Sequence, residues 1–191
     1  MNSWNWDGTR YIIEKPYRYG SAADYMDISA TGGISWVGAS GLVFGSCYGN
    51  DIGWTQAGAV QNTWYNVSDA DMVDGQLHGV THDGSGLLTV TEPGMYSISY
   101  SASVECDTQN KHLETGIEVS GSGSANAAGI NHIHLPNVAA MADTEWAVSC
   151  VCILDLSDNA TIEFAMRVTD AGAPDIFVDH LNIVVTQVGG T

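Results

Sequence analysis

The sequence predicts an all-β protein, built as a sandwich or a barrel of short strands. Three observations lead to this prediction. Apolar and polar residues alternate with a period of two along several segments, turn signals separate these segments, and no segment has the period of an amphipathic helix. Many short strands separated by turns, at spacings of roughly 8–12 residues, are typical of sandwiches and barrels.

The clearest predicted strand runs from Gly94 to Val104, where aromatic and aliphatic residues on one face alternate with four serines on the other. This is the pattern of a strand with one buried and one solvated face. Thr161–Thr169 and Leu113–Val119 repeat it, the second with Glu114 and Glu118 on its polar face. Shorter strands are predicted at Tyr25–Ser29, Ile34–Val37, Leu42–Tyr48, Thr63–Val67, Leu87–Thr91 and Asn131–Leu135.

Two late segments, Ala147–Leu156 and Ile176–Val188, are apolar on both faces. A sandwich strand needs only one apolar face, so we expect something to cover the second, and a subunit interface is the leading candidate. The alternative is a cover within the same chain, by residues 121–130 or by the N-terminal segment. The predicted interface residues are Val148, Cys150, Val151, Cys152, Ile153, Phe177, Leu181 and Ile183.

Charge is unevenly distributed along the 191 residues, whose formal net charge is −17. Residues 1–20 contain three basic and two acidic residues, a net charge of +1, together with five of the 17 aromatic residues. Because aromatic residues and arginine are enriched at protein interfaces, we interpret this segment as an arm that docks on another protein or a neighbouring subunit. The alternative is a first strand of the chain's own core. The predicted anchoring residues are Trp4, Trp6, Arg10, Tyr11, Lys15, Tyr17, Arg18 and Tyr19.

These patterns predict three parts: an anchoring arm over residues 1–20, a β-hairpin or connector over residues 21–41, and a head domain over residues 42–191. The remaining 171 residues after the arm contain two basic and 20 acidic residues, a net charge of −18. So acidic a surface cannot neutralise a phosphate backbone, which argues against nucleic-acid binding. We also expect no membrane insertion and no signal peptide, because the sequence has neither a long apolar run nor a basic-then-apolar start.

The order of strands and turns over residues 42–190 resembles a known superfamily. A turn at Pro93-Gly94-Met95-Tyr96 opens a long strand, residues 154–162 read Leu-x-Leu-Ser-Asp-Asn-x-x-Ile, and the last strand closes with Val188-Gly189-Gly190. This resembles the trimeric jelly-roll heads of the complement and tumour-necrosis-factor superfamily, in the version found in bacteriophage and environmental viral structural proteins. Such heads usually have Gly-Asp where this chain has Asp158-Asn159, and asparagine tolerates a positive φ nearly as well. Residues 22–28, with the turn at Gly32-Gly33, also resemble short modules of phage fibre and tail proteins.

The resemblance implies a jelly-roll β-sandwich that forms a homotrimer by cyclic contacts. The chain has no Gly-x-y collagen repeat and no apolar span, which favours the viral version. We therefore expect a non-enzymatic virion structural protein, assembled in the host cytoplasm. It would be a capsid decoration protein, or a head or tail fibre protein, whose arm binds a major capsid or tail protein. The alternative is a receptor- or carbohydrate-binding module at a fibre tip, which would bind a host-surface glycan through exposed Trp36, Trp54 and Trp146.

The sequence offers little catalytic or redox chemistry. No nucleophile elbow, phosphate-binding loop or His-Glu-x-x-His motif is present, so we expect no enzyme activity. Cys150 and Cys152 share one strand face and cannot easily bond each other. We expect free thiols, and a Cys106–Cys150 bridge is the alternative.

Two residue groups could bind a metal ion, although we expect no cofactor otherwise. His132 and His134 face the same way along a strand, so three copies near a threefold axis could bind a transition metal. Asp69, Asp71 and Asp74 could form a calcium loop, although their spacing differs from that of an EF-hand. The alternatives are a polar strand face for the histidines and a solvated acidic loop for the aspartates.

Overall fold

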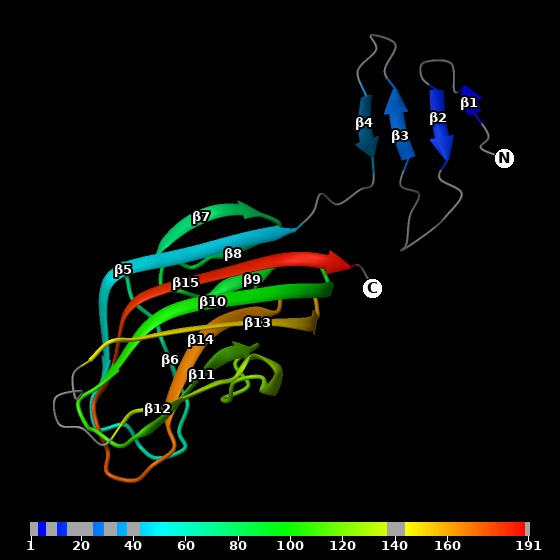
Figure 1. Ribbon diagram of the computed structural model, residues 1–191. Coiled ribbons are helices and arrows are strands. Elements are labelled where there is room, and N and C mark those ends of the chain that lie inside the picture. Colours follow the sequence, from blue (N-terminus) through cyan, green and yellow to red (C-terminus); the bar gives the residue numbers. More distant parts are fainter. Residues whose placement is uncertain are drawn as a thin grey trace. The chain divides into compact units, whose positions relative to one another are not determined.

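The computed structural model (Figure 1) describes residues 43–136 and 144–189, together with the backbone of four earlier strands. The chain divides into two compact units, of which one contains Met1–Gly41 with Gly190–Thr191 and the other contains Leu42–Gly189. We describe each unit by itself.

The first unit contains an antiparallel sheet with the strand order β1-β2-β3-β4. Its strands are β1 (Trp4–Trp6), β2 (Tyr11–Glu14), β3 (Tyr25–Ile28) and β4 (Ile34–Val37). β3 and β4 form the antiparallel pair that the sequence predicts as a hairpin. β2 lies in the predicted arm and β3 in the predicted hairpin, and the two strands pair with each other. One sheet therefore spans the boundary that we predicted at residue 20. Of the predicted anchoring residues, Trp4, Trp6 and Tyr11 lie in β1 and β2, whereas Arg10, Lys15, Tyr17, Arg18 and Tyr19 lie outside the described residues.

The second unit, which we call the head, is a sandwich of two antiparallel sheets. One sheet has five strands in the order β13-β10-β15-β5-β7. The other has six, with β12-β11-β14-β9-β8 in order and β6 paired to β14. Strand bounds are β5 (Phe44–Gln56), β6 (Tyr65–Asn66), β7 (Val73–His78), β8 (Val80–His82), β9 (Leu88–Val90), β10 (Gly94–Cys106), β11 (His112–Val119), β12 (Asn131–His134), β13 (Trp146–Leu156), β14 (Thr161–Val168) and β15 (Ile176–Gly189).

The core of the head lies between the two sheets. The apolar face predicted for Gly94–Val104 is buried along its whole length, and the Tyr100 ring meets the Phe164 ring edge-on, with 5.0 Å between the ring centres. In Figure 1 the long strands β5, β15, β10 and β13 lie side by side as one layer, with β14 and β11 in the other. The prediction of an all-β sandwich is confirmed. Among the described residues the single helix is a 3-10 turn at Ala127–Gly129, and no helix there could cross a membrane.

The predicted turn at Asp158-Asn159 has the expected geometry. Asn159 has a φ of 59°, in the left-handed region that asparagine tolerates better than most residues. The Ala160 N–H donates to the Ser157 carbonyl and closes the turn, at 3.1 Å. Asparagine can therefore turn the chain here without a glycine.

Three details of the head differ from the sequence prediction. β7 and β8 occupy Val73–His82, for which the sequence predicts no strand, and β7 begins inside the acidic loop predicted at Asp69, Asp71 and Asp74. A register shift in β15 between Val178 and His180 brings Ile176 and Val178 into the core, although simple alternation would place them opposite Leu181. Glu114 and Glu118 are buried rather than solvated: Arg167 binds the first, and the Gly123 N–H donates to the second at 2.6 Å.

Candidate interaction surface

The outer face of the five-stranded sheet, the face turned away from the core, is the candidate functional site. Strand register aligns four rows of four residues across β5, β15, β10 and β13. Each of these residues is exposed or half-buried, whereas those between them point into the sandwich. We call these sixteen positions the uncharged face, which ends at the next row, where the exposed Asp155 lies opposite Met95. Its rows are Phe44, Thr186, Ser97 and Ile153; Ser46, Val184, Ser99 and Val151; Tyr48, Asn182, Ser101 and Ser149; and Asn50, His180, Ser103 and Ala147.

The composition of this face is unexpected for so acidic a chain. Its four rows contain no aspartate, glutamate, lysine or arginine. Solvated strand faces in a chain of net charge −17 would ordinarily contain acidic residues. In the sequence, the four serines of β10 could have indicated this lack of charge, because they are polar but uncharged. The sequence prediction interpreted them only as a solvated face.

Exposed apolar residues are concentrated on the same sheet. Val151 is 64% exposed, Ile153 is 58% exposed and Val188 is 56% exposed. Of the large exposed hydrophobic residues among the described ones, all but Val60 lie on the five-stranded sheet: Phe44, Tyr48, Val73, Met95, Val151, Ile153 and Val188. Such clustering is typical of a surface that another molecule covers. Residues 121–130 do not cover Val151 and Ile153, so this alternative is wrong for these two residues.

The structure divides the predicted interface residues between two environments. Val151 and Ile153 point outward from β13 on the uncharged face. Cys150 and Phe177 are half-buried. The other four, Val148, Cys152, Leu181 and Ile183, are buried in the sandwich core of their own chain, and two of them, Val148 and Leu181, also line the groove described next.

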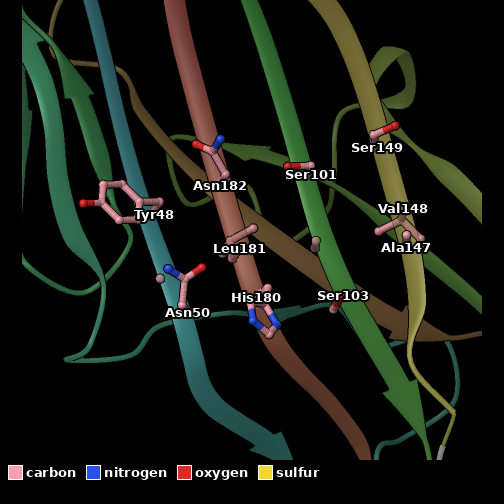
Figure 2. Close-up of a pocket in the computed structure, with 12 residues that line it drawn as sticks. Tyr48, Asn50, Ser101, Ser103, Ala147, Val148, Ser149, His180, Leu181 and Asn182 are labelled. Atoms are coloured by element: carbon pink, nitrogen blue, oxygen red, sulfur yellow. The ribbon is translucent and has the colours of Figure 1, made fainter.

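A groove of about 560 Å³ lies at one end of the uncharged face. Figure 2 shows its side chains rising from four adjacent strands, with His180 and Asn182 on the central β15. The side chain of His180 is 45% exposed, but its Nδ1 atom is buried and has no hydrogen-bond partner among the described residues. The polar residues that line the groove are Tyr48, Asn50, Ser101, Ser103, Ser149, His180 and Asn182.

Both cations of the head are engaged outside the uncharged face. Arg167 on β14 forms an ion pair with Glu114 on β11, and its guanidinium lies over the Trp64 ring, 4.6 Å from the ring centre. The Lys111 ammonium donates to the Ala171 carbonyl. Neither side chain belongs to the uncharged face, so this face has no resident cation to attract an acidic partner.

The predicted metal ligands contact other groups instead of converging. His132 Nδ1 lies 3.0 Å from Glu114 Oε1, and the His134 ring stacks on His112 with 4.2 Å between centres. These histidines lie on β12, in the six-stranded sheet. Asp69 accepts a hydrogen bond from the Asp71 N–H, and Asp74 lies 2.6 Å from His82 Nδ1. Within the described part of the chain, no three histidine, cysteine or acidic side chains are arranged to hold a metal ion.

The remaining predicted side chains have structural environments. Trp54 and Trp146 are half-buried and pack against the core, so the prediction that they are exposed is wrong, and the side chain of Trp36 lies outside the description. No disulfide joins any two of the four cysteines, so the alternative of a Cys106–Cys150 bridge is wrong. Burial, with smaller contributions from the Asp83 and Asp74 carboxylates, raises the pKa of the Cys47 thiol to about 12. Such a thiol is unreactive at neutral pH.

Comparison with known proteins identifies the fold. No protein-family model and no curated protein sequence matches the chain. The Eiger tumour necrosis factor of S. frugiperda superposes with a TM-score of 0.53 over 78% of this chain and 94% of its own, at 9% identity. The globular domain of the zebrafish complement 1qA protein covers 79% of this chain and 100% of its own, at 14% identity and a TM-score of 0.46. The head therefore has the jelly-roll fold of a tumour necrosis factor.

Proposed function

We propose that the head self-associates through the uncharged face, as a homotrimer without enzyme activity. The observation that supports this is the absence of charge from sixteen neighbouring positions in a chain of net charge −17. Two copies of so acidic a protein repel each other wherever their carboxylates meet. A face without carboxylates is the surface on which a second copy can lie without that penalty.

The positions of the apolar residues fit a cyclic contact. Val151 and Ile153 lie on β13 at one edge of the sheet, and Phe44, Tyr48 and Val73 lie on β5 and β7 at the other. A ring of identical subunits requires two different patches, one that each subunit presents to its neighbour and one that it receives. The number three comes from the resemblance to trimeric jelly-roll heads.

A charge substitution tests this contact. In the full chain, Val151→Asp places a carboxylate on the uncharged face, and we expect it to abolish self-association, because burying an unpaired charge costs several kcal/mol. Val60→Asp is the matched control, since Val60 is 59% exposed, close to the 64% of Val151, but lies outside the five-stranded sheet. Sedimentation velocity on the three proteins measures the assembly. A monomeric parent chain, or a trimer that tolerates Val151→Asp, contradicts the proposal.

We further propose that the protein is a virion structural protein, a capsid decoration or fibre protein anchored by residues 1–20. The support is the resemblance to viral jelly-roll heads and the composition of this segment, which has a net charge of +1 and five aromatic residues beside a strongly acidic head. Aromatic and basic side chains are the usual anchors at protein interfaces.

Copy number and binding separate the forms of this proposal. In purified particles, a decoration protein is present at a copy number comparable to that of the major capsid protein, whereas a glycan-binding fibre tip is scarce and binds host cells. A triple variant, Arg10→Gln, Lys15→Gln and Arg18→Gln, tests the arm in the full chain. We expect it to form trimers but to bind particles less tightly than the parent. Unchanged particle binding contradicts the anchoring role.

A further inference from the structure

Three of the six histidines lie at one edge of the six-stranded sheet. His112 lies on β11, and His132 and His134 lie on its neighbour β12, the edge strand of this sheet (Figure 1). Leu113 and Ile133, which alternate with them, pack in or against the core, so the three imidazoles point outward. These histidines belong to the sheet that does not carry the uncharged face, so a site here is independent of the proposed self-association.

His112 and His134 are direct cross-strand neighbours. The register of β11 and β12 places them opposite each other, and in the next pair the Leu135 N–H donates to the Lys111 carbonyl at 2.8 Å. Hydrogen-bonded and non-hydrogen-bonded pairs alternate along an antiparallel ladder, so His112 and His134 form a non-hydrogen-bonded pair, the kind whose side chains lie closest. Their rings are parallel to within 6°, with 4.2 Å between the ring centres.

The ring of His112 is held in one orientation by Asp170. The Asp170 carboxylate accepts a hydrogen bond from the His112 backbone N–H at 2.6 Å, and the same oxygen lies 2.9 Å from the ring Nδ1. A carboxylate only accepts hydrogen bonds, so in the neutral ring Nδ1 has the proton and Nε2 has the free lone pair. Metal-binding histidines almost always have this arrangement, in which a carboxylate fixes both the ring and its tautomer.

The ring of His134 can turn toward the same ion. It is exposed, and among the described residues this ring forms no hydrogen bond or ion pair. Two nitrogens that bind one ion at about 2.0–2.1 Å lie roughly 3–3.4 Å apart. The two rings are already 4.2 Å apart between centres, so a modest rotation of the His134 ring brings one of its nitrogens within that range of His112 Nε2.

From these observations we propose that His112 and His134 bind a divalent transition-metal ion through one ring nitrogen each, with water in the remaining coordination positions. Imidazole nitrogen suits copper, nickel and zinc ions, whereas calcium and magnesium ions prefer oxygen ligands. The net charge of −17 raises the concentration of cations near the protein. An ion held by both rings links the edge strand β12 to β11.

His132 is the alternative partner for His134, and the geometry favours His112 instead. Residues two apart on one strand are separated by about 6.5–7 Å, further than a directly opposed cross-strand pair. His132 lies opposite Glu114 in the register, and its Nδ1 is 3.0 Å from the Glu114 carboxylate. The two histidines that alternate along β12 therefore do not form the closest pair of imidazoles at this edge.

The test uses the full chain without an affinity tag and Cu²⁺ as the probe, because among these ions Cu²⁺ binds such sites most tightly. Isothermal titration calorimetry measures the affinity, and electron paramagnetic resonance of the complex counts the bound nitrogens. We expect the parent chain to bind Cu²⁺ with two imidazole nitrogens. His112→Gln and His134→Gln should each weaken binding at least about tenfold and leave a one-nitrogen spectrum. His132→Gln is the matched control, since His132 is 73% exposed on the same strand and also contacts a carboxylate, and its affinity should equal that of the parent.

Asp170→Asn tests the positioning of the His112 ring. An amide can donate to Nδ1 as well as accept from it, so it no longer fixes the tautomer that leaves Nε2 free. We expect the affinity for Cu²⁺ to fall by about tenfold, the usual effect of losing such a partner, while the spectrum still shows two nitrogens. A purely structural role of Asp170 would change the stability of the protein but not the affinity for Cu²⁺.

Several outcomes would overturn the site. A parent chain that binds no Cu²⁺, or binds it through a single nitrogen, has no such pair of ligands. Binding that neither His112→Gln nor His134→Gln weakens belongs to another part of the chain. Loss of binding in His132→Gln equal to that in His134→Gln assigns the ion to the two histidines of β12. Circular dichroism without metal confirms that each variant is folded, and His134→Gln keeps the test decisive if His112→Gln is not, because the His134 ring forms no hydrogen bond among the described residues.

Discussion

The hydroxyl of Tyr100 on β10 lies 3.0 Å from the hydroxyl of Thr115 on β11, so this pair links the two sheets through the core of the head. The same Tyr100 oxygen lies 3.2 Å from the carbonyl oxygens of Thr115 and Gly129. Three polar contacts thus converge on one buried phenol. Apolar packing alone sets no exact position of one sheet over the other. The hydrogen bond between Tyr100 and Thr115 is directional, so it determines the position of β10 relative to β11.

Tyr100→Phe should lower the free energy of unfolding by about 1–2 kcal/mol, because it removes a buried hydroxyl and leaves its partners less satisfied. The ring remains in place against Phe164, so the loss reports the hydrogen bonds rather than packing. Urea unfolding of the two proteins measures the difference. Tyr48→Phe removes an exposed hydroxyl and should change stability little. Equal effects of the two substitutions would contradict this role of Tyr100.

Cys47 should make the head sensitive to alkali. Burial, followed by the Asp83 and Asp74 carboxylates, raises the pKa of its thiol from 9.0 to about 12. Above pH 9 the unfolded chain loses this proton while the folded chain keeps it, so stability falls as the pH rises from 9 toward 12. The slope from one thiol is at most about 1.4 kcal/mol per pH unit.

Cys47→Ala should reduce the slope between pH 9 and pH 10, where the Cys152 thiol, whose pKa burial also raises from 9.0, contributes the remainder. Tyr100 contributes only above that range, because burial raises its pKa from 10.0 to about 12. Unfolding by urea at a series of alkaline pH values tests the expectation. A Cys47→Ala protein that loses stability with the same slope as the parent between pH 9 and pH 10 would exclude Cys47 as the source.

Glu163 should destabilise the head near neutral pH. It lies directly opposite Glu118 in the register of β14 and β11, and burial together with the Glu118 and Asp83 carboxylates raises its pKa. The folded state therefore binds this proton more tightly than the unfolded state, and stability rises as the pH falls through the raised pKa toward 4.5.

Glu163→Gln should stabilise the head at neutral pH by about 0.2–1 kcal/mol, the usual size of a cross-strand like-charge effect at a site that solvent partly screens. The glutamine oxygen can still accept the hydrogen bond from Asn66, which the parent forms at 2.9 Å. Glu145→Gln, at an exposed position, is the matched control and should have little effect. Thermal unfolding at about pH 7 and about pH 5 compares them, and a destabilised Glu163→Gln protein would contradict the argument.

The sequence predicted most of the head because period-two patterning is local. The serines of β10 and the apolar residues between them define its two faces without knowledge of any partner strand. β7 and β8 were missed because Asp74, Gly75 and Gly79 make their segment look like a loop, and pairing with neighbouring strands overrides that local preference. The burial of Glu118 depends on an N–H group from the following turn, which alternation cannot reveal.

The candidate surface could be predicted only in part, for a related reason. The two apolar faces of Ala147–Leu156 predicted a covered interface, and in the single chain Val151 and Ile153 of this segment are exposed. The β15 register shift, which one strand's sequence does not show, decides which of its residues face outward. The polar groove could not be predicted from any one strand. Its lining residues come from four strands that are distant in the sequence, and only the strand register brings them together.

Gly94 should be irreplaceable at the start of β10. Its φ is 153°, and a Cβ added there would lie 2.6 Å from the Gly189 carbonyl oxygen, a backbone atom of the neighbouring strand β15. A backbone atom cannot move aside as a flexible side chain can, so Gly94→Ala forces β10 and β15 apart at this end. We expect a loss of at least about 2 kcal/mol in the free energy of unfolding.

Gly84→Ala separates the contribution of backbone conformation from that of the close contact. Gly84 also has a positive φ, of 84°, but a Cβ there would meet nothing within 4 Å. This control should lose only about 1 kcal/mol, the usual cost of a left-handed conformation for alanine. Urea unfolding of both variants measures the two losses. Because β10 and β15 are central strands of the proposed assembly surface, Gly94→Ala should also weaken self-association, whereas Gly84→Ala, in the turn after β8, should not. Equal losses of stability would show that steric approach at Gly189 is unimportant.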